Sequence, residues 1–393
     1  MLLFCVREAV ALSSLGRVLV APAGMVSISG PVVHQYSDKW IMWFHGREES
    51  PTVDLPPISS GQVAVAESTD GLCWKMVGVA LSRNEEEWWA FDTAHVGLGD
   101  VFPLSAATDD DAAYRRFACS STSLPKGMYF FGGAEGETEL RSLGIEKDGT
   151  VAAMDLRVGL AVSQGDVDKF ARMEGDFPTG EILSIAEDDN QWDATYVGWP
   201  SIVDDPKTGA RYMTYQALDK RTKRQAVGLA KSASKNNNAI LFKKLSMEKP
   251  AFGETSEEKA TPAYAKAGVT RRCLRPQKKQ GYQMWFEGQS MDGEHSIGRA
   301  TTSAKELAAN VDWTVDDDPC FQSSPDPDAW DAGSVSAPFV CRLDEHTLRM
   351  YYSGASADDK KKMAIGVAES KDHGRTWTRV DIDAQATTEE LSA

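Results

Sequence analysis

The sequence is poor in the features that mark several large protein classes. Only six of its 393 residues are cysteine, and no two of them form a CxxC pair or show zinc-site spacing, so nothing requires an oxidising compartment. No apolar run reaches the length of a membrane-spanning helix. The N-terminus is a poor secretory signal, since Arg7, Glu8 and Arg17 interrupt its apolar stretches. We therefore expect no membrane span, and we favour an intracellular or organellar location over secretion.

Basic residues are also fewer than acidic residues. The chain has 42 Lys and Arg residues against 58 Asp and Glu residues, which gives a net charge of -16. Nucleic acids and anionic membranes are bound by basic faces, so this balance argues against both and mildly against a polyanionic substrate. The sequence also has no phosphate-binding GxxxxGK loop, no GxGxxG turn after a strand and no GxSxG nucleophile turn.

What the sequence does contain is a module that repeats five times. Each copy has short runs of alternating apolar residues separated by polar turns, which predicts strands rather than helices. Each copy closes on an aromatic residue, and these are Trp74, Phe170, Phe242, Trp313 and Trp377. A sheet of about four strands cannot bury both faces alone, so we expect the copies to stack around an axis. The predicted fold is all-β, a five-bladed β-propeller with four-stranded antiparallel blades around a central channel.

The continuous repeat predicts a single domain in spite of the length of the chain. We expect an N-terminal extension over 1–19, the propeller over 20–382 and a C-terminal tail over 383–393. The blades are expected near residues 20–80, 88–172, 190–245, 258–315 and 328–382. Turns such as the one over residues 370–377, Ser-Lys-Asp-His-Gly-Arg-Thr-Trp, are interpreted as structural, with the Trp filling the space between neighbouring blades.

Three aspartates recur at one place in the module. Asp92, Asp193 and Asp331 each lie seven residues before the Gly or Pro of the predicted inner strand. The first copy has Gly24 at this place, and the fourth has a residue near Ala260. Because inner strands converge on the channel of a propeller, we expect the three carboxylates near one mouth. Glycosidic cleavage needs two carboxyl groups, and a third can raise the pKa of the acid; the alternative is that each Asp caps its own strand.

Other candidates lie where one copy differs from the next. His45 and Arg47 end the apolar strand of the first copy, and later copies have Gln216, Glu287 and Ser353 at the position of His45. Positions that vary on a repeating scaffold are where function tends to lie. We therefore expect His45, Arg47 and Gln216 to contact a substrate, and we count Glu287 among the candidate catalytic carboxylates.

Aromatic and imidazole side chains flank the aspartates. His95 lies three residues after the aspartate of the second copy, and Tyr196 holds the matching place in the third. Trp192 and Trp330 directly precede their aspartates and offer flat faces on which a sugar can stack. All four are candidate substrate-binding residues, and packing within the blades is the alternative explanation.

The repeat, with an Asp-x-x-x-Val stretch opening several inner strands, resembles the five-bladed propeller glycoside hydrolases. This is the arabinanase, levansucrase and invertase superfamily, with families 43, 32, 68, 117 and 130 as typical members. The resemblance spans roughly residues 20–382. It implies a glycoside hydrolase or phosphorylase that acts on a small-molecule or oligosaccharide substrate, with Asp92, Asp193, Asp331 and Glu287 as the catalytic candidates.

The chain also departs from that superfamily. Families 43 and 32 carry an essential Asp on the first inner strand, where this chain has Gly24. Family 130 works with a single catalytic Asp, and its phosphate needs a basic cradle, which His45, Arg47 and His95 would supply. A catalytically inactive propeller that serves as a binding or assembly platform for a protein partner is therefore the alternative function.

Two further alternatives rank lower. The Ser-x-Asp-x-Gly turns resemble the Asp box of sialidases, but we count five copies rather than six and find no arginine triad at matched positions. Some propellers of this superfamily hold a calcium ion in the channel. The acidic stretches over residues 316–318 and 326–328 do not have the spacing of an EF-hand loop, so we expect no cofactor.

Overall fold

The computed structural model describes residues 14–48, 61–104, 118–119, 121–143, 148–152, 154–219, 221–233, 241–253, 261–278 and 280–382. The elements that lie wholly within these ranges are β-strands, apart from two short 3₁₀ turns, η2 (Leu140–Leu143) and η3 (Ala263–Ala265). None of the described helical turns is long and apolar enough to cross a membrane. The predicted tail over 383–393 and most of the predicted N-terminal extension lie outside the described residues.

The strands form antiparallel groups of four in which strands successive along the chain pair with each other. The groups are β2 (Met25–Tyr36), β3 (Trp40–Glu48), β4 (Gln62–Ser68) and β5 (Lys75–Leu81); β6 (His95–Pro103), β8 (Lys126–Gly133), β11 (Leu156–Ser163) and β12 (Ala171–Met173); β13 (Val197–Asp204), β14 (Arg211–Asp219), β15 (Arg224–Ser232) and β16 (Phe242–Lys244); β17 (Gly268–Pro276), β18 (Tyr282–Gln289), β19 (His295–Thr302) and β20 (Thr314–Val315); and β21 (Ser334–Arg342), β22 (Leu348–Ala355), β23 (Met363–Ser370) and β24 (Thr378–Arg379). The predicted all-β fold with antiparallel sheets is confirmed.

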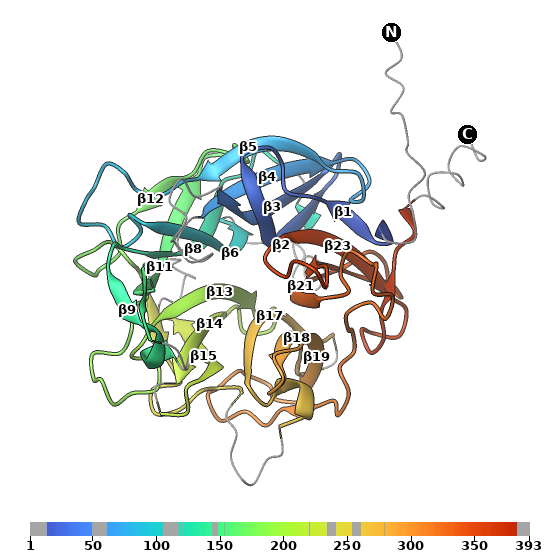
Figure 1. Ribbon diagram of the computed structural model, residues 1–393. Coiled ribbons are helices and arrows are strands. Elements are labelled where there is room, and N and C mark those ends of the chain that lie inside the picture. Colours follow the sequence, from blue (N-terminus) through green and yellow to red (C-terminus); the bar gives the residue numbers. More distant parts are fainter. Residues whose placement is uncertain are drawn as a thin grey trace.

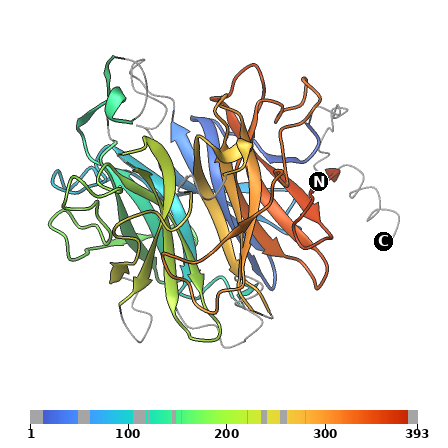
Figure 2. The same ribbon diagram turned by 90° about the horizontal axis from the view of Figure 1, so that it is seen from below.

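Short strands supplement these groups. β7 (Ala118–Cys119) pairs in parallel with β2, and β9 (Glu137–Glu139) and β10 (Thr150–Ala152) form a hairpin of their own. A single parallel pairing between β15 and β17 joins the third and fourth groups into one sheet. Figure 1 shows the groups arranged around a centre, with β2, β6, β13, β17 and β21 nearest to it. Figure 2 shows the same arrangement from the side.

The second strand of each group lies in the most apolar surroundings. Every residue of β8, β14 and β22 is buried. A strand in the middle of a sheet whose two faces are both covered needs apolar residues on both faces. This explains why these segments are rich in apolar and aromatic residues, whereas the outer strand β5 alternates between exposed and half-buried residues over its first five positions.

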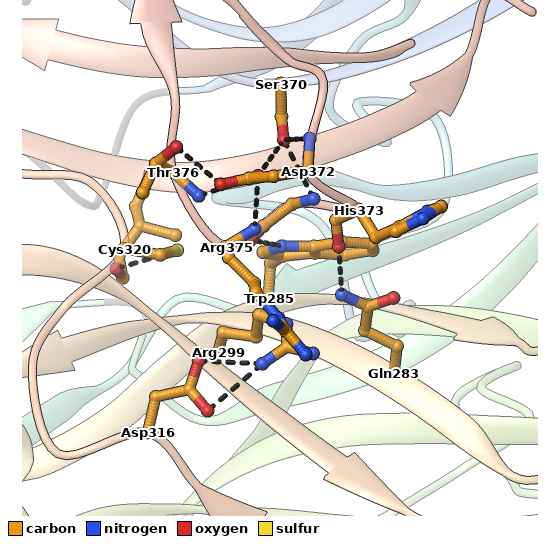
Figure 3. Close-up of polar contacts among 12 residues, drawn as sticks. Gln283, Trp285, Arg299, Asp316, Cys320, Ser370, Asp372, His373, Arg375 and Thr376 are labelled. Atoms are coloured by element: carbon orange, nitrogen blue, oxygen red, sulfur yellow. Dashed lines mark hydrogen bonds and ion pairs between the residues drawn. The ribbon is translucent and has the colours of Figure 1, made fainter. Parts of the chain in front are cut away.

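The turn between the two outer strands of the last group docks onto its neighbour (Figure 3). Ser370 Oγ donates a hydrogen bond to Asp372 (2.7 Å), and the amide of Gly374 donates to Ser370 Oγ (2.8 Å). The indole N–H of Trp285 on β18 donates to the Gly374 carbonyl (3.0 Å). Trp377 is buried and packs edge-on against Trp285, with ring centroids 6.0 Å apart. The closing Trp therefore fills the space between two groups, as expected for a structural turn.

The first group repeats this docking. Its turn at residues 68–74 has the same Ser-to-Asp bond, from Ser68 Oγ to Asp70 (2.8 Å). The Tyr351 hydroxyl on β22 donates to the Gly71 carbonyl (2.7 Å). In both places the turn of one group bonds to the second strand of a neighbouring group. The turn of the fifth group bonds to the fourth group, and the turn of the first group bonds to the fifth.

The start of the described chain belongs to the last group rather than to the first. β1 (Arg17–Leu19) pairs antiparallel with β23, and Figure 1 shows the two strands side by side. The indole of Trp330 also donates a hydrogen bond to the Leu15 carbonyl (2.9 Å). Residues 17–19, which the sequence interpretation placed before the propeller, thus join the two ends of the described chain in one sheet.

Candidate functional site

The first strand of each group carries an irregularity at the same level. Its pairing with the second strand shifts between Ser29 and Val32, Leu98 and Asp100, Gly198 and Ser201, Val269 and Arg272, and Ser336 and Phe339. Such bulges turn residues out of the hydrogen-bonded ladder. The bulged residues of β2, β6, β13, β17 and β21 line a cavity at the centre of the molecule. The bulges therefore decide which side chains face the axis.

The bulges also correct the alignment of the fourth copy. Proline or glycine holds the second position of the bulge in four groups, and Arg271 takes that place in β17. Seven residues before it lies Tyr264, rather than a residue near Ala260, which is outside the described residues. Tyr264 is buried and donates its hydroxyl proton to the Asp316 carbonyl (3.0 Å). An aromatic ring thus stands where three other groups have an aspartate.

Asp92, Asp193 and Asp331 are not brought together by the structure. Each is almost fully buried and is bound within its own group by a cation from the outermost strand, and two are bound by a tyrosine of the second strand as well. The partners are Arg172 for Asp92 (2.7 Å), Lys244 and Tyr215 for Asp193 (2.6 and 2.9 Å), and Arg379 and Tyr352 for Asp331 (2.7 and 2.8 Å). None of the three is among the residues that line the central cavity. The recurrence of these aspartates is explained by an ion pair that recurs inside each of these three groups and links its beginning to its outermost strand.

The flanking tryptophans have a comparable role. Trp192 is fully buried, stacks on Tyr215 and donates its indole proton to the Ser246 carbonyl (2.8 Å). Trp330 stacks on Tyr352 in the same way. Both rings are covered by their own group, so neither offers a free face to a sugar.

His45 and His95 lie against each other between the first and second groups. Their ring centroids are 5.3 Å apart, and their side chains are 3% and 0% exposed. Burial is the main cause that lowers the pKa of His95 to about 3 and the pKa of His45 well below its ordinary value. Within the described part of the chain, none of their four ring nitrogens has a hydrogen-bond partner. Both rings are therefore neutral and hold unused hydrogen-bonding capacity.

Gly61 covers this pair of imidazoles. A Cβ at this position would lie 2.4 Å from His45 Nε2 and 2.9 Å from the ring of His95. Any larger residue would have to displace both rings, so glycine is required here for close approach.

Two arginines reach the same region. Arg47 lies two residues after His45 on β3, hence on the same face of the strand. Arg271 extends from the bulge of β17 across to β2, where its Nη1 lies 3.2 Å from the place of a Cβ on Gly30. Burial, and then the charge of Arg271, lowers the pKa of Arg47 to about 10. Neither guanidinium has an ion pair or a hydrogen bond to another described residue.

Trp199 provides the aromatic surface of the cavity. The Arg271 guanidinium carbon lies 5.7 Å from its ring centroid, and the Phe131 ring lies 4.4 Å from it on the way to the imidazoles. Trp199 has a φ of 46°, an uncommon left-handed conformation for a bulky residue. Arg272 holds it there by donating a hydrogen bond to its carbonyl (2.7 Å). Gly30 and Ala337, each also directly before a proline, have φ values of 63° and 49°, so this conformation belongs to the repeated bulge.

Glu287 lies on β18, close to the level of the bulges in the first strands. It accepts a hydrogen bond from His295 Nδ1 (2.8 Å) and another from the backbone amide of Ala337 on β21 (3.2 Å). Burial opposes ionisation, but these bonds and the charge of Arg271 keep the pKa of Glu287 below its ordinary value. The same bond raises the pKa of His295 against the effect of burial. The pair is a carboxylate with a proton donor attached.

Tyr196 and Gln216 form a polar contact of their own. Gln216 Nε2 donates to the Tyr196 hydroxyl (3.2 Å) and to the side chain of Gln225 (3.1 Å), and the first two side chains are nearly fully buried. Burial raises the pKa of Tyr196 to about 12, so its hydroxyl remains protonated.

The sequence-derived candidates therefore divide into two sets. The structure places His45, Arg47, His95 and Glu287 close to the level of the bulges, with Tyr196 and Gln216 nearby, although none of the six is among the residues that line the cavity. It places the aspartates and tryptophans inside the groups. Arg271, Trp199 and His295 were missed by sequence analysis, although an arginine in the place of a recurring proline was a readable signal for the first of them. Among the described residues, no cluster of His, Cys, Asp and Glu has an arrangement that would hold a metal ion.

The fold is shared with solved carbohydrate-active enzymes. A structure described as a glycoside hydrolase has a TM-score of 0.62 and 18% identity, over 93% of this chain and 94% of its own. The β-1,2-mannobiose phosphorylase from Listeria innocua has a TM-score of 0.55 and 13% identity, over 90% and 94%. Zg3597, a family 117 glycoside hydrolase of Zobellia galactanivorans, has a TM-score of 0.54 and 15% identity, over 90% and 88%.

No family model matches the chain, and no curated protein is significantly similar to it in sequence. At identities this low, the likeness to solved structures shows a shared fold. The resemblance to the propeller glycoside hydrolases that the sequence predicts is confirmed at that level.

Proposed function

We propose that this protein is a five-bladed β-propeller that binds a carbohydrate at the mouth of its central channel and cleaves or transfers a glycosidic bond there. Each four-stranded group is then one blade, and the mouth is the end where the inner strands begin. One observation carries the proposal, namely where the unused polar atoms of the interior lie.

Buried side-chain atoms without a hydrogen-bond partner gather at this mouth. The described part of the chain has fourteen such atoms, and eight of them belong to residues on or beside the bulges of the inner strands. They lie on His45, Arg47, His95, Trp199, Thr270 and Ser336. Buried polar atoms are almost always bonded, because leaving one unpaired is costly. A polyhydroxylated ligand offers both donors and acceptors to such a surface, so a sugar suits it better than an apolar molecule.

Glu287 and His295 are the residues to which we assign proton transfer. An ionised carboxylate suits a base or a nucleophile, and a histidine with a raised pKa suits a proton donor. The contact between them makes one acid–base unit. The fold likeness to a phosphorylase and to hydrolases leaves both water and phosphate as acceptors of the cleaved sugar.

A non-catalytic carbohydrate-binding platform is the second candidate. It is favoured by the fact that Asp92, Asp193 and Asp331 are all held in ion pairs away from the cavity. Standard hydrolysis needs two carboxyl groups about 5–10 Å apart on either side of the bond. Asp100 lines the cavity, but it is buried and accepts hydrogen bonds from Ser201 and from the Ile202 amide, so we assign it a structural role rather than that of the second carboxylate.

The test is activity on a panel of aryl glycosides and oligosaccharides, with and without phosphate. We expect turnover by the wild type and a loss of kcat/KM of about 100-fold or more for Glu287→Gln. The matched control is Glu345→Gln, which makes the same chemical change on an exposed side chain in the turn between β21 and β22. Equal loss in both variants, or no turnover on any sugar by folded wild type, would leave only the binding platform.

A further inference from the structure

Two cations near the mouth, Arg47 and Arg271, make no ion pair with a described carboxylate. Asp100, which lines the cavity, already accepts hydrogen bonds from Ser201 and from the Ile202 amide of β13. Arg271 lines the cavity, whereas Arg47 comes from β3 and is not part of its lining, and both lie near the part of β2 around Gly30. Arg271 Nη1 lies beside Gly30 itself. Arg47 stands opposite Ser27 in the pairing of β2 with β3, three residues away along the strand. The two guanidiniums therefore approach the same corner.

The carboxylate nearest to these arginines is already engaged. Both oxygens of Glu287 accept hydrogen bonds, one from His295 and one from the Ala337 amide. No ion pair joins Glu287, or any other described carboxylate, to Arg47 or Arg271. The charge of Glu287 raises the pKa of Arg271 against the effect of burial, but no ion pair forms between them. Half-buried cations without a directly paired anion are costly.

The surroundings of this corner suit one oxyanion that is attached to a sugar ring. His45 and His95 can donate hydrogen bonds without adding charge, since both are neutral and buried with unbonded nitrogens. Trp199 lines the cavity beside Arg271 and is half-buried, so part of its apolar ring is accessible. A pyranose ring would cover that surface, whereas free phosphate has no apolar part and would leave it bare.

We infer that the channel mouth is a subsite for an acidic sugar, with the carboxylate of a uronic acid held between Arg47 and Arg271 and the sugar ring against Trp199. Guanidinium groups present paired N–H donors that match the two oxygens of a carboxylate. This inference rests on the proposed function for the nature of the ligand, but it concerns binding and does not require turnover.

The experiment is calorimetric binding of glucuronate, galacturonate, mannuronate and iduronate to the full chain. Each is compared with its uncharged methyl ester, with the matching neutral hexose and with inorganic phosphate. We expect at least one uronate to bind at least tenfold more tightly than its ester. Arg47→Met and Arg271→Met should each weaken that binding about 10- to 100-fold, whereas Arg375→Met, which removes an exposed charge elsewhere, should not change it.

Folding is checked by the thermal midpoint without ligand. Replacing an unpaired half-buried cation with an apolar residue should leave that midpoint equal or higher. Arg271→Lys is the second variant, because it keeps the charge and loses the paired donors, and it should weaken binding severalfold.

Three outcomes would overturn the inference. The first is a panel in which no uronate binds better than its ester. The second is binding of phosphate alone, which would place a free anion at the arginines. The third is uronate binding that all three Met variants retain. Binding without turnover would instead leave this inference standing and remove the proposed catalysis.

Discussion

The fold strongly lowers the pKa of the two imidazoles, His45 and His95. Burial, and then the charge of Arg47, lowers the pKa of His95 from 6.5 to about 3. The pKa of His45 shifts in the same direction through burial and the charges of His95, Arg47 and Arg271. None of the four ring nitrogens has a described hydrogen-bond partner, and buried polar atoms without a partner are costly. The two histidines therefore lower the free energy of unfolding of the protein without ligand.

The His95 shift predicts how stability depends on pH. Between about pH 6.5 and pH 3 the unfolded chain binds a proton at this residue and the folded chain does not. Stability therefore falls as the pH drops through this window, by about 1.4 kcal/mol per pH unit for one group. Urea unfolding of the wild type and of His95→Gln at several pH values measures it, and the variant should show the shallower fall.

The control for this prediction is His346→Gln. His346 is exposed, so its loss should leave the pH dependence of the wild type unchanged. If His95→Gln and the wild type lose stability in parallel below pH 6.5, then His95 is charged in the folded protein and the mouth is not as enclosed as described.

At the same scale, the sequence identified residues that interrupt the repeat. His45, Arg47 and His95 stood out because other copies have different side chains at those places. Arg271 was missed although it stands where other copies have proline or glycine, and Trp199 gave no such signal. The position of both residues relative to the axis depends on a bulge that only strand pairing reveals. A bulge changes which side chain faces the axis without leaving a clear mark in the apolar alternation.

At the scale of the element, each buried aspartate ties the beginning of its group to the outermost strand. Asp193 binds Lys244 of β16 and the Tyr215 hydroxyl of β14. Burial lowers the pKa of Lys244 although Asp193 counteracts it, which shows how much this cation depends on its partner.

We predict that Asp193→Asn destabilises the protein by about 3 kcal/mol, because it leaves the charge of Lys244 buried and unpaired. Chemical denaturation measures the change. The double variant Asp193→Asn with Lys244→Met should regain most of the loss. Asp292→Asn, which alters an exposed aspartate, should have no effect.

This set of variants separates the two interpretations that the sequence left open for the recurring aspartates. If Asp193 were a catalytic carboxylate, the Asn variant would fold with normal stability and lose turnover. If it is a cross-link, stability falls and the double variant restores turnover together with stability. The pattern over three copies predicted a shared role, but the cation on the outermost strand lies 51 residues away in the sequence for Asp193 and could not be assigned to it.

At the scale of the whole molecule, the order of the strands was readable because the alternation of each strand is local. The joining of the two ends was not. β1 is only three residues long and its partner β23 lies near the other end of the chain, so no local pattern links them. The sequence therefore assigned Arg17–Leu19 to an extension, although Leu19 is 9% exposed and part of the core.

We predict that β1 contributes measurably to global stability. Removing residues 1–21 deletes the burial of Leu19 and the hydrogen bonds that Leu15 and Gly16 accept from Trp330 and Val367. Together these are worth about 4 kcal/mol, which for a chain of this size lowers the thermal midpoint by about 5 °C. Calorimetry measures the shift. Leu19→Ala should reproduce part of it, whereas Val20→Ala, at a side chain that is 54% exposed, should reproduce none. A truncated protein that melts with the wild type would mean that the last group is complete without β1, and that the sheet it joins does not hold the two ends of the chain together.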